Sequence, residues 1–352
     1  DALPISVYSA FVILFKSIGY FENVKLTNTA GSGGGRLIEN YGELGLISVT
    51  IANGDVTGAQ HATGRGGGIF NGNTSNGLFP AFISFAQNSV ITGNKARKGG
   101  GIYNDAGIIN ELNVTISNNT ATDGGGIFNV STTPMNQDFT NGIIRSVNTK
   151  IQGNTARAGG GIFNRGLVEL LAGSAITGNS TITTGAASGE LCLGSGSCDG
   201  LGGGVLSVHL LPTTQVPIVS DTRFMLQTST LSNNSATARG GGIYSVGVLE
   251  LAGNAINSNQ AADGGAIYVS APTDGAQHYC NTYGDSTVGN ATFNSNTASS
   301  GYSIVSGSNA GVVSFRACVF KGLKSPTRPT YMTAASNGGP NYCKAVTLDP
   351  SS

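Results

Sequence analysis

The sequence predicts an all-β fold, a parallel β-helix of about ten coils with three short strands each, and three observations point to it. A short motif recurs with nearly constant internal spacing. Glycine accounts for 55 of 352 residues, about twice its usual share. Charged residues are few, with 18 acidic and 18 basic side chains, and there is no Trp. This composition excludes a basic nucleic-acid binder, an acidic disordered tail and a helical bundle.

The recurring motif begins with an apolar residue, two spacers and Asn, and ends with a glycine triplet, Ile and an aromatic residue. It is complete from Ile91 to Tyr103. The step from the first apolar residue to the second is eleven residues in every copy but one, and twelve from Leu231 to Ile243. Such constancy indicates short strands that stack along one axis, because a unit of this length cannot bury its apolar face alone.

The spacing between copies varies much more than the spacing within them. The extra residues fall in stretches rich in Pro, Gly and Thr near 131–142 and 181–200. We expect these stretches to be inserts that leave the coil at one corner or side. The sequence therefore predicts one domain, in which 1–30 form an apolar cap or partner-pairing segment, 31–320 the β-helix and 321–352 a C-terminal cap or tail.

The asparagines of the motif should stack from coil to coil, since they occupy the same place in each copy. A side-chain ladder of this kind also satisfies the backbone of the turns. The predicted ladder contains Asn94, Asn119, Asn154, Asn179, Asn234, Asn259 and Asn296. The glycine triplets suit a corner that needs positive φ and close approach between coils. We expect these asparagines to hold corners and to have no catalytic role.

Two charge pairs should also stack just before the glycine corner. Lys98 and Asp123 occupy the same place in successive copies, as do Arg239 and Asp263. The alignment predicts an exposed ion pair between coils in each case, each contributing on the order of 0–1 kcal/mol.

Two segments resemble a known repeat. Phe293-Asn-Ser-Asn296 and Gly264-Gly-Ala-Ile267 match the Phe-x-x-Asn and Gly-Gly-Ala-Ile motifs of the polymorphic outer-membrane protein repeat. The resemblance covers roughly residues 30–320 and implies a right-handed parallel β-helix in a secreted or surface-displayed protein with an adhesive or structural role. Unlike in those relatives, we expect no C-terminal autotransporter barrel, because only residues 321–352 follow the last repeat.

Strand alternation should turn one aromatic residue of each coil outward, because the neighbouring Ile points inward. This series contains Phe70, Tyr103, Phe128, Phe163, Tyr244 and Tyr268, with Leu206 in the gap. Two interpretations are open. Long inserts cover the series and make a second small core, or it is an exposed contact stripe for neighbouring subunits or sugar rings.

Five cysteines fit an oxidising compartment. Cys192 and Cys198 lie in one Gly/Ser-rich loop and are predicted to form a disulfide. Cys280, Cys318 and Cys343 leave one further bridge and one odd thiol, and the sequence does not choose between them.

The sequence offers little for catalysis. A polysaccharide hydrolase needs carboxylates on neighbouring coils of one face, and a lyase needs a calcium-binding acidic cluster with a basic residue nearby. The carboxylates that can be aligned, Asp123, Asp263, Glu169 and Glu250, lie on different sides of the predicted coil. We therefore expect no enzyme activity, no catalytic residue, no cofactor and no metal, and a polysaccharide lyase or hydrolase is the least favoured function.

The leading hypothesis is a non-catalytic structural protein, extracellular or on the cell surface, that associates with copies of itself into a filament, sheath or surface layer. The apolar start of the chain motivates it, because a β-helix has open ends that must be capped or joined. The apolar stretch Ile5–Phe15 is too short to span a bilayer, which needs about 20 residues. The chain begins at Asp1, which predicts that a signal peptide has been removed. The alternative is an adhesin that binds glycans or a host surface through the aromatic series, and nucleic acid is not an expected partner.

Overall fold

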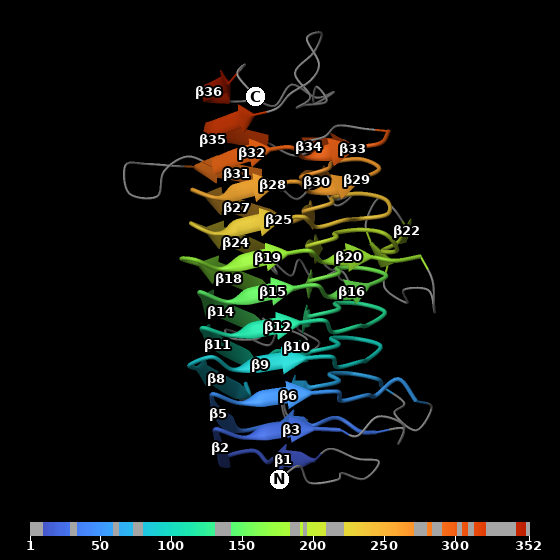
Figure 1. Cartoon of the computed structure of the whole chain (residues 1–352), viewed down its shortest axis with the longest axis vertical. Coiled ribbons are helices and arrows are strands. Elements are labelled where there is room, and N and C mark those ends of the chain that lie inside the picture. The colour runs from blue at the N-terminus through green and yellow to red at the C-terminus, as the bar shows by residue number, and fades with distance from the viewer. Residues whose placement is uncertain are drawn as a thin grey trace, which may run out of the picture.

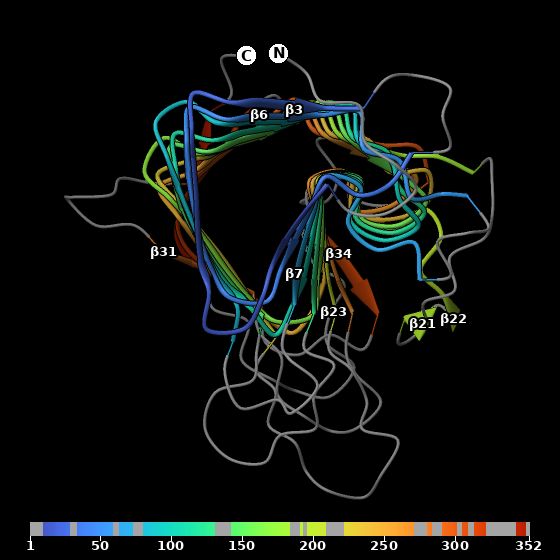
Figure 2. The ribbon, with the colours of Figure 1, turned by 90° about the horizontal axis from the view of Figure 1, so that it is seen from below.

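The computed structural model describes residues 10–28, 34–58, 63–72, 80–130, 142–183, 191–192, 196–208, 222–270, 280–283, 291–300, 305–308, 313–321 and 343–349. Their strands form a parallel β-helix, as the repeat predicted. Figure 1 shows the strands stacked from the N-terminal to the C-terminal end, and Figure 2 shows the coil in cross-section. Among these residues, no helix is long and apolar enough to cross a bilayer.

Each coil contributes one strand to each of three faces, and every face is built from parallel neighbours. The first face consists of β1 (Phe11–Ile13), β4 (Ile38–Asn40), β7 (Ile69–Gly72), β10 (Ile102–Asp105), β13 (Ile127–Val130), β17 (Ile162–Asn164), β23 (Val205–Val208), β26 (Ile243–Val246), β30 (Ile267–Ser270) and β34 (Val305–Ser308).

The second face follows the first in each coil. It consists of β2 (Ile18–Glu22), β5 (Glu43–Ile47), β8 (Phe82–Ala86), β11 (Ile108–Leu112), β14 (Ile143–Val147), β18 (Leu167–Leu171), β24 (Arg223–Gln227), β27 (Val248–Ala252), β31 (Cys280–Tyr283), β35 (Val313–Lys321) and β36 (Cys343–Asp349).

The third face completes the coil, and it joins the second face where β35 pairs with both β31 and β32. It consists of β3 (Lys25–Thr27), β6 (Thr50–Ala52), β9 (Val90–Thr92), β12 (Thr115–Ser117), β15 (Lys150–Gln152), β19 (Ala175–Thr177), β25 (Thr230–Ser232), β28 (Ala255–Asn257) and β32 (Ala291–Asn294).

The motif asparagines and glycine triplets lie in a lobe between the third face and the first, visible beside the main coil in Figure 2. Two short parallel pairs run through it, β16 (Thr155–Ala156) with β20 (Ser180–Thr181) and β29 (Gln260–Ala261) with β33 (Thr297–Ala298). An antiparallel pair, β21 (Leu191–Cys192) with β22 (Gly196–Ser197), extends from it. The glycines fit as predicted. Gly99 has a φ of 64°, and a Cβ on Gly100 would come within 2.4 Å of the Gly125 carbonyl oxygen of the next coil.

The main core is a column of mostly aliphatic side chains inside the three faces, together with Phe85, Phe224 and Phe293. The Ile residues after the glycine triplets are register partners, for example Ile102 with Ile69 and Ile127, and all three are fully buried. In the second face, Val168 and Leu170 are buried, while Glu169 between them points outward. The eleven-residue step therefore identified the inward positions.

The predicted domain boundaries differ from the described coils at both ends. Strands β1, β2 and β3 already pair in register with β4, β5 and β6, so the first coil begins at Phe11 and not after residue 30. Strand β36 pairs with β35, so the segment 321–352 contributes a strand to the second face. The first coil was missed because it lacks the Asn and glycine-triplet motif.

Candidate functional site

The seven asparagines of the predicted ladder form one continuous chain of hydrogen bonds. At each step the Nδ2 of one asparagine donates to the Oδ1 of the next at 3.0 Å, through Asn94, Asn119, Asn154, Asn179, Asn234, Asn259 and Asn296. The second Nδ2 hydrogen goes to a backbone carbonyl, which for Asn119 is that of Ile91 at 3.0 Å. The Asn119 Oδ1 also accepts the backbone N–H of Asn94 at 2.9 Å. These amides are engaged in holding the turn of each coil.

A second asparagine ladder lies on the first face, and the sequence analysis missed it. Its members lie two residues after the first residue of the strand, at the position that follows the aromatic residue in most coils. They are fully buried and bond from coil to coil at 2.8–3.2 Å, in the order Asn40, Asn71, Asn104, Asn129, Asn164 and Ser207. The signal was present, because Asn follows Ile and an aromatic residue at positions 71, 104, 129 and 164.

Of the two interpretations of the aromatic series, the exposed contact stripe is wrong and the second core is confirmed. Phe70, Tyr103, Phe128, Phe163, Tyr244 and Tyr268 are only 0–9% exposed. Their rings stack with centroids 4.6–5.5 Å apart, except where Leu206 interrupts the series. They belong to a second core on the outer side of the first face, together with apolar side chains such as Val130, Val208 and Leu201. Strand alternation correctly predicted that these rings point away from the main core, but the lobe covers the outer side of the first face.

Cationic side chains lie over the rings of this second core. The charged groups of Arg36, Arg65, Lys98, Arg165 and Arg239 are 4.8–5.3 Å from the ring centroids. Lys98 lies over Phe128, and Arg239 over Tyr268. Lys98 and Asp123 are register neighbours, as are Arg239 and Asp263, as the alignment predicted. The ion pairs within these two couples stay a prediction, but the expected exposure is wrong for Asp123, which is 2% exposed.

Cys198 is fully buried in the second core and is disulfide-bonded. It directly follows β22, which pairs with the strand that contains Cys192. The predicted Cys192–Cys198 bridge stays a prediction, because the Cys192 side chain lies outside the described residues, as do the side chains of Cys280, Cys318 and Cys343.

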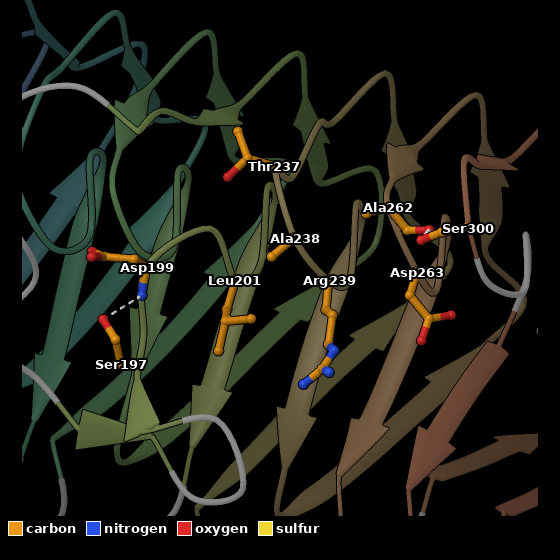
Figure 3. A pocket seen from close by; sticks show the side chains of 9 residues that line it. All are labelled: Ser197, Asp199, Leu201, Thr237, Ala238, Arg239, Ala262, Asp263 and Ser300. Carbon is orange, nitrogen blue, oxygen red and sulfur yellow. Dashed lines mark hydrogen bonds between the residues drawn. The ribbon is translucent and has the colours of Figure 1, made fainter.

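An open groove of about 680 Å³ runs along the lobe near the C-terminal half of the coil. Figure 3 shows its lining side chains, which come from four successive turns. They are Ser197, Asp199, Leu201, Thr237, Ala238, Arg239, Ala262, Asp263 and Ser300. Sequence reasoning did not find this groove, because it depends on how turns of unequal length stack.

Asp199 is held at one end of this groove by the guanidinium of Arg157. The Arg157 Nε donates to Asp199 Oδ1 at 3.0 Å, and Nη2 donates to Oδ2 at 2.8 Å. Arg157 Nη1 also donates to the backbone carbonyl of Thr183 at 2.6 Å. The paired hydrogen bonds raise the pKa of Arg157 and fix the carboxylate in one orientation.

One carboxyl group lies inside the main core. Glu111 in β11 is 3% exposed, and its Oε2 accepts a hydrogen bond from the Ser146 hydroxyl at 2.6 Å. Its Oε1 and the nearby Thr149 hydroxyl are buried, and neither makes a hydrogen bond of normal geometry. Burial raises the pKa of Glu111 to about 7. The Thr149 hydroxyl nevertheless lowers the pKa of Glu111, as Ser146 does, against the larger effect of burial. The strand register makes this position inward, since Ile109 two residues earlier is also buried.

Among the described residues, no three His, Cys, Asp or Glu side chains are grouped so that they could hold a metal ion. No family model, no curated protein and no solved structure matches this sequence. The similarity to the polymorphic outer-membrane protein repeat therefore remains a resemblance carried by the two motifs.

Proposed function

We propose that the protein is a non-catalytic structural protein, extracellular or on the cell surface, that associates end to end with copies of itself through its first coil. The apolar surface of that coil is the observation that carries the proposal. Five of the seven exposed large hydrophobic side chains in the described part of the chain belong to it: Val12, Leu14, Phe15, Ile18 and Tyr20. Ile18 is 78% exposed and Leu14 is 63% exposed. A concentration of this kind is typical of an interaction surface.

The backbone at this end also favours association. Within the described residues, β1, β2 and β3 are each paired on one side only. Unpaired parallel edges are templates for another strand. A second copy stacked head to tail would continue the parallel register, and a head-to-tail contact that does not close gives an open filament. Burying Ile18 in that contact would contribute about 2 kcal/mol.

The experiment compares an end variant with a side variant. Ile18→Lys places a charge in the proposed contact, whereas Leu112→Lys places one on a lateral corner where the side chain is 45% exposed. Sedimentation velocity over a range of concentrations, with negative-stain electron microscopy, should show association of the unmodified protein and of Leu112→Lys but not of Ile18→Lys. Circular dichroism checks that each variant keeps its β-helix. The proposal is refuted if the unmodified protein is monomeric at all concentrations, or if Ile18→Lys associates as well as the unmodified protein does.

The extracellular location is supported by the disulfide bond of Cys198, because such bonds persist in oxidising compartments. Peptide mapping under non-reducing conditions tests both the bond and its predicted partner, Cys192. Recovery of Cys198 as a free thiol from protein of the native source would contradict this part of the proposal.

The non-catalytic role is supported by what the polar side chains do. The two asparagine ladders use their amides between coils, and Asp199 is neutralised by Arg157. The direct test is an assay for release of reducing or unsaturated ends from plant, algal and bacterial polysaccharides, with and without calcium. Turnover of any of them by purified protein, lost on Asp199→Asn or Asp263→Asn, would replace the structural proposal with an enzymatic one.

A further inference from the structure

We propose that the groove of the lobe is a binding site for a neutral oligosaccharide. The site is independent of the end-to-end association proposed above, because it lies on the side of the coil and not at its first turn. Its lining comes from the turns before β23, β26 and β30 and from the turn after β33. Three steps between coils correspond to about 14 Å, so the groove is long enough for a chain of several sugar rings.

The charges of the groove favour a neutral ligand. Asp199 is compensated by the two hydrogen bonds from Arg157, and Arg239 lies in register beside Asp263. The four charged groups therefore sum to zero, with no surplus of one sign to attract a polyanion or a polycation. A ligand that carries many hydroxyl groups and no charge suits this balance.

The polar groups of the groove match hydroxyl groups in type. Arg239 offers only donors, Asp263 offers acceptors, and the Thr237 hydroxyl can act as either. The Ser300 hydroxyl donates to the Ala262 carbonyl oxygen at 3.0 Å and can still accept. A sugar hydroxyl also donates and accepts, so it can bridge a guanidinium and a carboxylate placed side by side. Figure 3 shows Arg239 and Asp263 next to each other on the same side of the groove. Hydrogen bonds to these charged groups are stronger than those between neutral groups.

The groove is also rigid and partly apolar. Arg239 is held over the Tyr268 ring at 5.0 Å, and Asp199 is fixed by Arg157, so both side chains are oriented before a ligand arrives. Ala238 and Ala262 add methyl groups between the polar residues, whereas Leu201 is 2% exposed and belongs to the second core. The two methyl groups can contact the C–H face of a sugar ring, while the polar residues contact its edge.

The first experiment measures binding by isothermal titration calorimetry. The probes are four neutral tetrasaccharides, namely maltotetraose, cellotetraose, laminaritetraose and mannotetraose, with tetragalacturonate as the charged comparison. Arg239→Ala removes the central donor and should weaken binding about tenfold or more. Lys98→Ala is the matched control, because Lys98 lies over Phe128 as Arg239 lies over Tyr268, but outside the groove. It should bind as the unmodified protein does.

A second measurement locates the ligand even if a variant folds poorly. With alanine methyl groups labelled for nuclear magnetic resonance, the bound tetrasaccharide should shift the signals of Ala238 and Ala262 but not that of Ala121, which occupies the lobe several coils away. Three results overturn the proposal. The first is that none of the four neutral probes binds at millimolar concentration, and the second is that tetragalacturonate binds more tightly than they do. The third is binding that Arg239→Ala does not weaken and that leaves the methyl signals of Ala238 and Ala262 unshifted. Each leaves the end-to-end association untouched, because that is tested at Ile18.

Discussion

Glu111 should make the stability of the β-helix depend on pH in the direction opposite to that of an ordinary ion-paired carboxylate. Its carboxyl group lies in the main core, where one oxygen accepts a hydrogen bond from Ser146 and the second makes no hydrogen bond of normal geometry. Burial raises its pKa from the ordinary value of 4.5 to about 7. The native state therefore keeps a proton on Glu111 at pH values where the unfolded chain has released it.

The sign follows from proton linkage. Between pH 4.5 and 7 the native state binds more protons at this site than the unfolded state does, so the free energy of unfolding falls as the pH rises. The contribution of Glu111 is fully present below pH 4.5 and is lost as the pH passes 7. The shift from 4.5 to about 7 corresponds to about 3 kcal/mol over this window.

The perturbation is Glu111→Gln, which keeps the shape and cannot ionise. Its amide oxygen can still accept from Ser146, and its NH₂ group can donate to the Thr149 hydroxyl. We subtract the free energy of unfolding of the unmodified protein from that of the variant. This difference should be about 3 kcal/mol larger at pH 8 than at pH 4. Glu43→Gln is the control, because Glu43 is an exposed residue on the same face.

The assay is urea denaturation followed by far-ultraviolet circular dichroism at several pH values from 4 to 8. Comparing each variant with the unmodified protein at the same pH cancels the titration of the other carboxylates. An unchanged difference between Glu111→Gln and the unmodified protein across this range would refute the assigned pKa. A pH-dependent difference of the same size in Glu43→Gln would refute its assignment to the buried carboxyl group.

Two further predictions concern side chains that hold the coils together, and urea denaturation measures both. Asn119→Ala removes a ladder amide and leaves buried backbone groups of neighbouring coils without partners. It should therefore lower the free energy of unfolding by about 2–4 kcal/mol. Its control is Asn110→Ala on the outer side of β11, which should change the free energy of unfolding by less than about 0.5 kcal/mol. Phe128→Ala should cost about 3–5 kcal/mol because the ring is buried in the second core, and Tyr20→Ala, at a ring that is 58% exposed, should cost much less. Equal effects of the two members of either pair would contradict the burial on which the prediction depends.

The sequence was sufficient for the parts of the fold that repeat. The eleven-residue step identified the inward Ile column, and the alignment of Asn94 with Asn119 identified positions that are bonded in the structure. A stacked coil places identical residues one above another, so one-dimensional spacing carries three-dimensional information. The first coil was missed because Phe11–Thr27 follow the strand pattern without the turn motif.

Two kinds of feature could not be predicted from the sequence: whether an outward side chain is covered by another part of the chain, and how a strand is aligned with the strands of neighbouring coils. Alternation turned Tyr103 away from the main core, but only the stacked lobe shows that it enters a second core. Glu111 and Glu169 both lie on the second face, yet a shift of one position within the strand makes the first inward and the second outward. Composition does not show which of the two glutamates points inward, because this depends on how the strand pairs with the neighbouring coil.

The faces and the turns of each coil differ in how much their sequence varies, and this difference explains where binding sites can arise. The three faces and the two ladders repeat closely, because a change at one coil would break the hydrogen bonds and contacts of both neighbours. The turn of the lobe is freer, since several of its side chains contact solvent, and these residues differ from coil to coil: Arg97, Thr122, Arg157, Ala238 and Ala262. A repeat that is uniform inside and variable at its tip gives each stretch of the lobe its own surface chemistry. The balanced charges at Arg239 and Asp263 are one outcome of this freedom, and the exposed first coil is the place where the stacking itself can continue into a second molecule.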